Sequence, residues 1–134
     1  MLKKEKACGT IIIDNEKVLI INQKQGFYGF PKGHMENNET EIETAIRETK
    51  EETNLDVLID KEKRYSLNYV IDNKIDKEVI YFLAKPINKN IKKQESEIND
   101  ILWIDIDKVI DLLTFDNMKE LWKKVLKDIK NINF

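Results

Sequence analysis

Two runs of β-branched residues near the start of the chain constrain its fold most strongly. They are ACGTIIID (residues 7–14) and KVLIINQ (residues 17–23), and only Asn15 and Glu16 separate them. Runs of this composition with a two-residue polar connection predict a β-hairpin. GFYGFPKG (residues 26–33) follows with three glycines and a proline, which predicts a loop or a very short strand that ends in one.

The remaining segments alternate between helical and strand-like patterns. A helix is predicted from about Glu39 to Thr53, and the next strand-like segments are DVLID, RYSLNYVI, EVIYFLAKPI and ILWIDI. DNKID joins the second and third of them, which predicts another hairpin, whereas the polar KNIKKQESEIND is predicted to be a loop. Asp105 or Asp107 is expected to cap a short helix that runs through Leu113. This order of elements predicts an α/β (α+β) fold, with a mixed sheet and helices on both faces.

The last helix carries an apolar stripe. It is expected to start near Asp116, a suitable N-cap. The stripe has the spacing i, i+3, i+4, i+7, i+8, i+11, so one face should pack on the core. Its members are Met118, Leu121, Trp122, Val125, Leu126 and Ile129.

Length and composition restrict the class of protein. A chain of 134 residues without a linker predicts a single domain over residues 1–134. The net charge of −2 predicts no surface for polyanions, so no stable nucleic-acid complex is expected. The single cysteine, Cys8, lies in an apolar run and is expected to be buried and unpaired. We find no signal peptide and no apolar run of membrane-spanning length, and therefore expect a cytoplasmic protein without a membrane partner.

Glutamates crowd the segment GHMENNETEIETAIRETKEETNL (residues 33–55) and the helix predicted inside it. Asn38 is a suitable N-cap, and Glu41 stands three residues later, which is the capping-box arrangement. Negative charge in the first turn also suits the positive end of the helix dipole. The predicted buried stripe has helical spacing, with the Thr49 hydroxyl bonded to the carbonyl one turn back. This stripe consists of Ile42, Ala45, Ile46 and Thr49.

Glu48, Glu51 and Glu52 need a separate explanation. They share one patch near the helix C-terminus, where negative charge is unfavourable. Each like-charge pair at i, i+4 costs roughly 0.2–0.5 kcal/mol. The residues alone leave two interpretations: a solvated face relieved by Arg47 and Lys50, or a divalent cation site. Carboxylate oxygens suit Mg²⁺ or Mn²⁺, and the lack of a histidine or cysteine cluster disfavours zinc.

The spacing of these acids favours the cation site. Five residues separate Gly33 from Glu39, and seven more separate Glu39 from RETKEETNL. This arrangement resembles the signature of the Nudix hydrolases, G-x5-E-x7-R-E-U-x-E-E-x-G-U, where U is bulky and apolar. Thr49 departs at the first U and Asn54 at the last glycine, where Asn is the next-best residue for a left-handed C-cap. The matching positions are Gly33, Glu39, Arg47, Glu48, Glu51, Glu52 and Leu55.

This resemblance implies an α/β/α sandwich and hydrolysis of a nucleoside diphosphate linked to another group. It implies Mg²⁺, or alternatively Mn²⁺, held by Glu48, Glu51 and Glu52 together with the carbonyl of Gly33. Arg47 would orient a glutamate rather than touch substrate. Either Glu48 or Glu51 would deprotonate the attacking water.

Within the family, the chain is most similar to asymmetrical bis(5′-nucleosyl)-tetraphosphatases, which cleave diadenosine tetraphosphate (Ap4A) to ATP and AMP. The likeness lies in PKGH, RETKEET and LNYVIDNKIDKEVIYFLAK. Phe27 departs from it, because some relatives carry a phosphate-binding histidine there. For Tyr69, Tyr81 and Phe115 the alternative role is packing. For Lys77 and Glu97 the alternative is an ordinary surface charge. The resemblance implies phosphate contacts from Lys32 and Lys77, an adenine ring between Tyr69 and Phe115, Tyr81 near the phosphate chain, and Glu97 as a further metal-site carboxylate.

Two other functions stay open on the sequence. RNA 5′ pyrophosphohydrolases share PKG and an ESE-like loop, although the pI of about 5.6 argues against RNA. A nucleotide-sensing module without catalysis usually lacks a glutamate of the signature, and none is missing here. The oligomeric state is undetermined, with a monomer favoured.

Overall fold

The two β-branched runs form the hairpin that the sequence predicts. A computed structural model describes residues 1–130. Its first strands are β1 (Lys3–Asp14) and β2 (Lys17–Gln23), which pair antiparallel. The connecting residues Asn15 and Glu16 both have positive φ, at 49° and 63°. Such angles suit a two-residue hairpin turn.

Five more strands complete a mixed sheet. The parallel pairing of β1 with β6 places two distant segments of the chain side by side at its centre. The order is β3-β2-β1-β6-β5, with β4 added to β1 and β7 to β2. The additional strands are β3 (Tyr28–Gly29), β4 (Lys32–His34), β5 (Val57–Ile71), β6 (Ile75–Pro86) and β7 (Ile98–Asp105).

Two strands differ from their predicted extents. β5 is one long strand rather than the two predicted, with an irregularity in its pairing between Ile59 and Arg64. β7 begins at Ile98, inside the predicted loop. In both cases polar residues join a strand because a neighbouring strand supplies hydrogen bonds, which local composition does not reveal.

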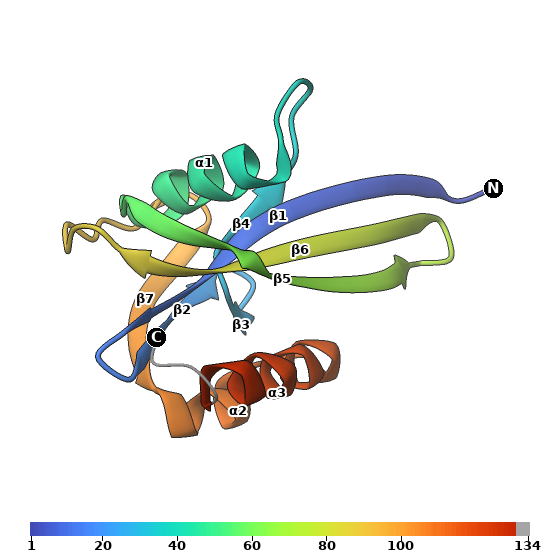
Figure 1. The fold of residues 1–134 in the computed structure, drawn as a ribbon. Helices are drawn as coiled ribbons and strands as arrows, with labels where there is room; N and C mark the ends of the chain where they lie inside the picture. The colour runs from blue at the N-terminus through green and yellow to red at the C-terminus, as the bar shows by residue number, and fades with distance from the viewer. Residues whose placement is uncertain (131–134) are drawn as a thin grey trace.

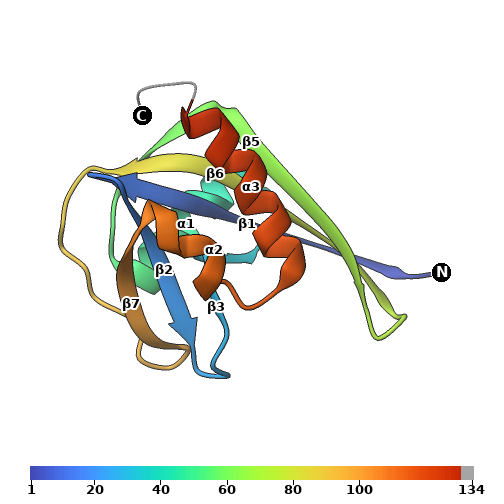
Figure 2. The ribbon, with the colours of Figure 1, turned by 90° about the horizontal axis from the view of Figure 1, so that it is seen from below.

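The helices lie on both faces of the sheet, as predicted (Figure 1). α1 (Glu41–Thr53) covers one face, and α2 (Val109–Leu112) with α3 (Asp116–Lys130) covers the other. A 3-10 turn, Ile106–Lys108, precedes α2. Figure 2 shows α3 running along β5, where the Tyr65 hydroxyl donates to Asp128 at 2.6 Å. The predicted stripe of α3 is confirmed, since Met118, Leu121, Trp122 and Val125 are buried and Leu126 and Ile129 pack against them.

The start of α1 is a correction. Thr40 is the N-cap, and its hydroxyl accepts from the Glu43 backbone N–H at 3.1 Å while Glu43 accepts from the Thr40 N–H at 2.8 Å. Asn38 has φ 72°, whereas an N-cap residue adopts extended backbone. Similarly, Asp116 is the first residue inside α3 rather than a cap before it. The C-cap expectation is confirmed, because Asn54 adopts the left-handed conformation at φ 65°.

The buried stripe of α1 also differs. Ile46 is 41% exposed, and Thr44, Thr53 and Glu52 are buried alongside Ala45. Thr49 is buried as predicted, but its hydroxyl bonds to the Thr10 hydroxyl of β1 at 2.7 Å instead of to the preceding helical turn. The face of α1 that packs on the sheet therefore carries small polar side chains, and one glutamate, Glu52, is buried on the same face.

Apolar side chains fill both faces of the sheet. Cys8 is fully buried near Ala45, and burial raises its thiol pKa to about 11, as an apolar setting predicts.

Among residues 1–130, no helix has both the length and the apolar character needed to cross a membrane.

Candidate active site

Helix α1 brings three glutamates to one cavity. Glu48, Glu51 and Glu52 line a space of about 590 Å³ between α1, β4 and the segment before β7. Their exposure falls from Glu51, whose side chain is 47% exposed, through Glu48 at 15% to Glu52, a residue that is 5% exposed. The three glutamates of the patch therefore differ in solvent exposure, with Glu51 nearest the solvent and Glu52 in the interior.

Arg47 ties this patch to the chain before α1. Its guanidinium donates to both oxygens of Glu39, at 2.7 and 3.1 Å, and to the backbone carbonyl of His34 at 2.9 Å. Another nitrogen donates to Glu48 at 2.9 Å and to Glu51 at 3.0 Å. The bonds from Arg47 to Glu39 are the main reason that the pKa of Glu39 is lowered to about 2, so Glu39 stays ionised. Arg47 thus links two of the three acids to the preceding loop.

Two glycines allow β4 to approach its neighbours closely. A Cβ on Gly33 would overlap the carboxylate of Glu48, so a side chain at this position requires that carboxylate to move. A Cβ on Gly9 in β1 would overlap the carbonyl oxygen of Pro31. This approach brings the backbone N–H of Lys32 to 3.2 Å from Glu52 Oε1.

Burial and like charge both disfavour ionised acids in this cavity. Burial, followed by repulsion from Glu48, raises the pKa of Glu52 to about 8. Burial is also the main reason that the pKa of Glu48 is raised. On the basic side, burial and then the charge of Lys77 lower the pKa of Lys32. A cation in the cavity would relieve the repulsion between the acids.

The donor set suits a divalent cation. It consists of hard carboxylate oxygens, the ligands that Mg²⁺ or Mn²⁺ prefers. One of these carboxylates, Glu52, is buried and has a raised pKa. Within residues 1–130, however, no three acidic, histidine or cysteine side chains already converge on one point. The three acids have different partners, since Glu48 and Glu51 accept from Arg47 whereas Glu52 accepts from the Lys32 backbone N–H. Gly33 adjoins these acids at the same cavity.

Two distant segments complete the cavity wall. Glu97 lies in the turn before β7, fixed by a backbone bond from Lys24 to its carbonyl at 2.9 Å, and its charge contributes to the raised pKa of Glu48 and Glu52. Lys77 comes from β6, with its ammonium 3.4 Å from His34 Nε2. The cavity therefore has acidic and basic sides.

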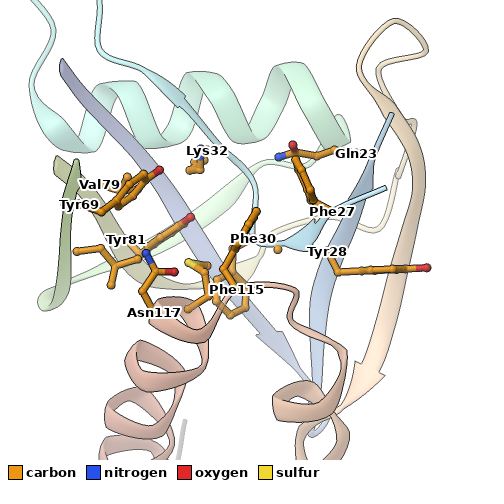
Figure 3. A pocket seen from close by; sticks show the side chains of 13 residues that line it. Gln23, Phe27, Tyr28, Phe30, Lys32, Tyr69, Val79, Tyr81, Phe115 and Asn117 are labelled. Atoms are coloured by element: carbon orange, nitrogen blue, oxygen red, sulfur yellow. The ribbon is translucent and has the colours of Figure 1, made fainter. Parts of the chain in front are cut away.

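An aromatic pocket adjoins this cavity (Figure 3). It has a volume of about 360 Å³ and shares Lys32 and Gln23 with the acidic cavity. Tyr69 and Phe115, the predicted adenine contacts, both line it. Phe115 is 47% exposed, and its ring packs at 4.9 Å from that of Phe27. The pocket thus contains both predicted aromatic residues, with a third ring against one of them.

Tyr81 is deeper than its predicted role implies. It is fully buried in the pocket wall, and burial raises its pKa well above the ordinary value of 10. Its hydroxyl has no hydrogen-bond partner within residues 1–130. The hydroxyl oxygen is itself buried, so among the described residues it has no exposed surface for a phosphate chain.

Sequence reasoning missed part of this pocket. Phe30, buried edge-on against Tyr81 at 5.6 Å, carried no signal beyond its place in a glycine-rich segment. Asn117 and Met118 follow Phe115 closely in sequence, and the start of α3 at Asp116 was the available signal that they share its location. The other lining residues that were not assigned to the site are Gln23, Tyr28, Gly29, Leu67 and Val79.

Comparison with known proteins places these features in a family. The model of the NUDIX domain matches residues 3–126. The bis(5′-nucleosyl)-tetraphosphatase [asymmetrical] of Rattus norvegicus is 32% identical over 130 residues, covering 85% of this chain and 88% of the relative. That of Sus scrofa is 34% identical with the same coverage.

Solved structures agree with this grouping. A Caenorhabditis elegans Ap4A hydrolase binary complex superposes with a TM-score of 0.84 at 27% identity, covering 96% of this chain and 99% of that one. A NUDIX hydrolase from Nitrosomonas europaea has a TM-score of 0.81 at 24% identity, covering 98% of this chain and 74% of that one, and supports the fold alone.

Proposed function

This chain belongs to the NUDIX domain family, and on that premise we propose that it hydrolyses Ap4A to ATP and AMP in a reaction dependent on Mg²⁺ or Mn²⁺. One observation carries the proposal. A cavity with acidic and basic sides opens beside an aromatic pocket, and Lys32 and Gln23 belong to both. Such a pair of compartments suits a nucleoside polyphosphate, because aromatic walls fit the base and charged groups fit the phosphates.

The acidic side is the proposed cation site. Glu48, Glu51, Glu52 and Glu97 would hold the cation, together with the Gly33 carbonyl. Support comes from the common cavity and from the raised pKa of the partly buried Glu48 and the buried Glu52. When bound, a divalent cation supplies positive charge that screens the polyphosphate and stabilises charge developing at the attacked phosphorus.

The chain's own residues have separate tasks around this centre. Arg47 keeps two of the acids oriented through its bonds to them and to Glu39, and makes no contact with substrate in this proposal. Lys32 and Lys77 bind phosphate oxygens as point charges. The attacking water loses its proton to either Glu48 or Glu51, and the pH profiles of Glu48→Gln and Glu51→Gln variants distinguish the two.

The aromatic pocket is the proposed base site. Its volume of about 360 Å³ lies in the range of small-molecule pockets. One adenine stacks against Tyr69 and Phe115, while the buried Tyr81 hydroxyl faces the phosphate side. We further propose that residues 1–134 form one monomeric domain that acts in the cytoplasm.

Product identity tests the function directly. Purified protein is incubated with Ap4A and Mg²⁺, and the products are separated by chromatography, with an EDTA-treated sample as control. We expect equal amounts of ATP and AMP, and none with EDTA. Two molecules of ADP, or no turnover, would exclude the proposal. Faster release of pyrophosphate from 5′-triphosphorylated RNA than cleavage of Ap4A would instead favour the RNA-processing alternative.

A further inference from the structure

The aromatic pocket contains a polar side chain, Asn117, that the proposed function leaves without a task. Three other polar side chains lie toward the acidic cavity: Lys32 and Gln23 belong to both spaces, and Tyr81 interacts electrostatically with Glu52. Asn117 lines the aromatic pocket but not the acidic cavity. It therefore lies away from the phosphate side, where the edge of a stacked base would be.

Asn117 is held firmly but has a free amide. It lies in the first turn of α3, between the exposed ring of Phe115 and the buried Met118. Backbone bonds from Met118 and Lys119 to the Phe115 carbonyl, both 3.1 Å, fix this turn. Figure 3 shows the Asn117 side chain directed into the pocket beside Tyr81. Within residues 1–130 its amide makes no hydrogen bond, although it is partly buried.

We propose that Asn117 is a specificity-determining residue that reads the edge of the purine bound in this pocket. Its amide carries a donor and an acceptor side by side, which is the complement of the N6 donor and N7 acceptor of adenine. Aromatic rings bind every base through its face, so stacking alone does not distinguish one purine from another. The inference rests on the proposed function only in assigning a purine nucleotide to the pocket.

The exchange of one atom at this position gives a sharp test. A carboxylate at position 117 keeps the shape of the side chain but only accepts hydrogen bonds. It would lose one of two bonds to adenine and would gain two, from N1–H and N2–H, only with a guanine that turns its Watson–Crick edge toward position 117. A neutral amide can also rotate to face guanine N1–H and O6, so the informative quantity is the change in base preference between variants rather than the preference of the natural protein.

The experiment compares the natural protein with Asn117→Asp and Asn117→Leu. The ratio of kcat/KM for Gp4G to that for Ap4A is measured with Mg²⁺, and the affinities for GMP and AMP are measured by calorimetry. We expect Asn117→Asp to raise the guanine-to-adenine ratio by roughly tenfold or more, the scale of one bidentate base contact. Asn117→Leu is expected to weaken binding of both bases without that shift. Asp116→Asn, at the exposed neighbouring residue outside the pocket, is the control for a change of charge.

The outcomes separate this inference from the proposed function. Turnover of Ap4A with an unchanged ratio in Asn117→Asp overturns the role of Asn117 and leaves the hydrolase proposal intact. Absence of turnover, with a shifted preference in GMP and AMP binding, overturns the hydrolase proposal alone. Because Asp116→Asn removes a negative charge where Asn117→Asp adds one, a shift of similar size in the opposite direction in Asp116→Asn would mean that charge near the pocket, rather than a contact, sets the preference. Failure of every variant and the natural protein to bind either nucleotide also overturns the inference.

Discussion

Replacing Glu52 with Gln should make the metal-free protein more stable and at the same time inactive. Glu52 is 5% exposed, and its pKa is raised to about 8 by burial and by Glu48. Glutamine copies the shape of the protonated acid but carries no charge at any pH. It removes a buried ionisable group that the fold disfavours, along with an oxygen ligand that the proposed cation needs.

The size of the stability effect follows from the pKa. Between the ordinary value of 4.5 and about 8, the folded protein keeps a proton that the unfolded chain releases. Stability therefore falls as the pH rises through this window, by about 1.4 kcal/mol per pH unit at most. At pH 7 the loss reaches about 3 kcal/mol, and at pH 4.5 or below it vanishes because the acid is neutral in both states. We expect the stability of Glu52→Gln to exceed that of the natural protein by up to this amount.

The assay is urea unfolding followed by tryptophan fluorescence, in EDTA, from pH 5 to pH 8. The gap between the variant and the natural protein should widen steadily with pH. Adding Mg²⁺ should stabilise the natural protein, since a ligand that binds only the folded state raises its stability, and should have much less effect on the variant. Hydrolysis of Ap4A by the variant should fall by roughly a hundredfold or more, the scale seen when a key electrostatic group is removed.

A control shows whether burial is the cause. Glu120 makes only a surface ion pair with Lys123, and its side chain is 69% exposed. Glu120→Gln should change stability by less than about 1 kcal/mol, without the same pH trend. A constant gap between Glu52→Gln and the natural protein across this pH range would refute the reasoning about Glu52. Unchanged turnover in Glu52→Gln would refute its place in the cation site.

Three further predictions concern neighbouring contacts. Gly33→Ala should displace the Glu48 carboxylate and lower kcat/KM for Ap4A by roughly tenfold or more, because a 1 Å misplacement near the chemistry can cost about a hundredfold. Thr49→Val should destabilise the fold by about 1–2 kcal/mol in urea unfolding, because the buried Thr10 hydroxyl loses its partner, whereas Thr10→Val with Thr49→Val should recover most of that loss. Glu41→Gln should remove about 1 kcal/mol of stability at pH 6 but nothing near pH 2, since the bonds from Arg64 and Lys6 hold the folded pKa of Glu41 at about 2.

Each of these has a contrary result. Full activity of Gly33→Ala would show that the Glu48 side chain is free to move aside without consequence. Equal stability of the Thr49→Val protein and the double variant would show that the two hydroxyls do not depend on each other. For Glu41, whose folded pKa is depressed, the stabilisation is present above about pH 4.5 and is lost as the pH falls toward 2, so a benefit that grows on acidification would contradict the assignment.

Local patterns were sufficient for three local features of the fold. The hairpin at Asn15 and Glu16, the apolar face of α3 and the left-handed cap at Asn54 depend on neighbours within a few residues, and all three are confirmed. Boundaries that depend on competition were predicted wrongly. The predicted capping box joins Asn38 and Glu41, but the box forms between Thr40 and Glu43, while Glu41 accepts from Arg64 instead.

The orientation of α1 required the tertiary structure. Apolar spacing predicted that Ile46 faces the sheet, yet it is exposed while Thr44 and Glu52 are buried. The close approach of β4 to β1 at Gly9, and the Thr10–Thr49 bond, favour small side chains between helix and sheet. Packing of this kind depends on contacts between segments far apart in the chain, which periodicity within one helix cannot supply.

The sequence by itself determined which acids gather on one helix face and which family the chain resembles, because helical spacing and the signature are local. Only the tertiary structure decided that Glu52 is buried, that Glu97 and Lys77 reach the same cavity, and that Tyr81 is buried together with its hydroxyl. Those facts depend on the parallel pairing of β1 with β6 and on the docking of α1 and α3 on opposite faces of the sheet. Burial then sets the pKa of each acid, since desolvation depends on everything packed around a group rather than on its neighbours in sequence.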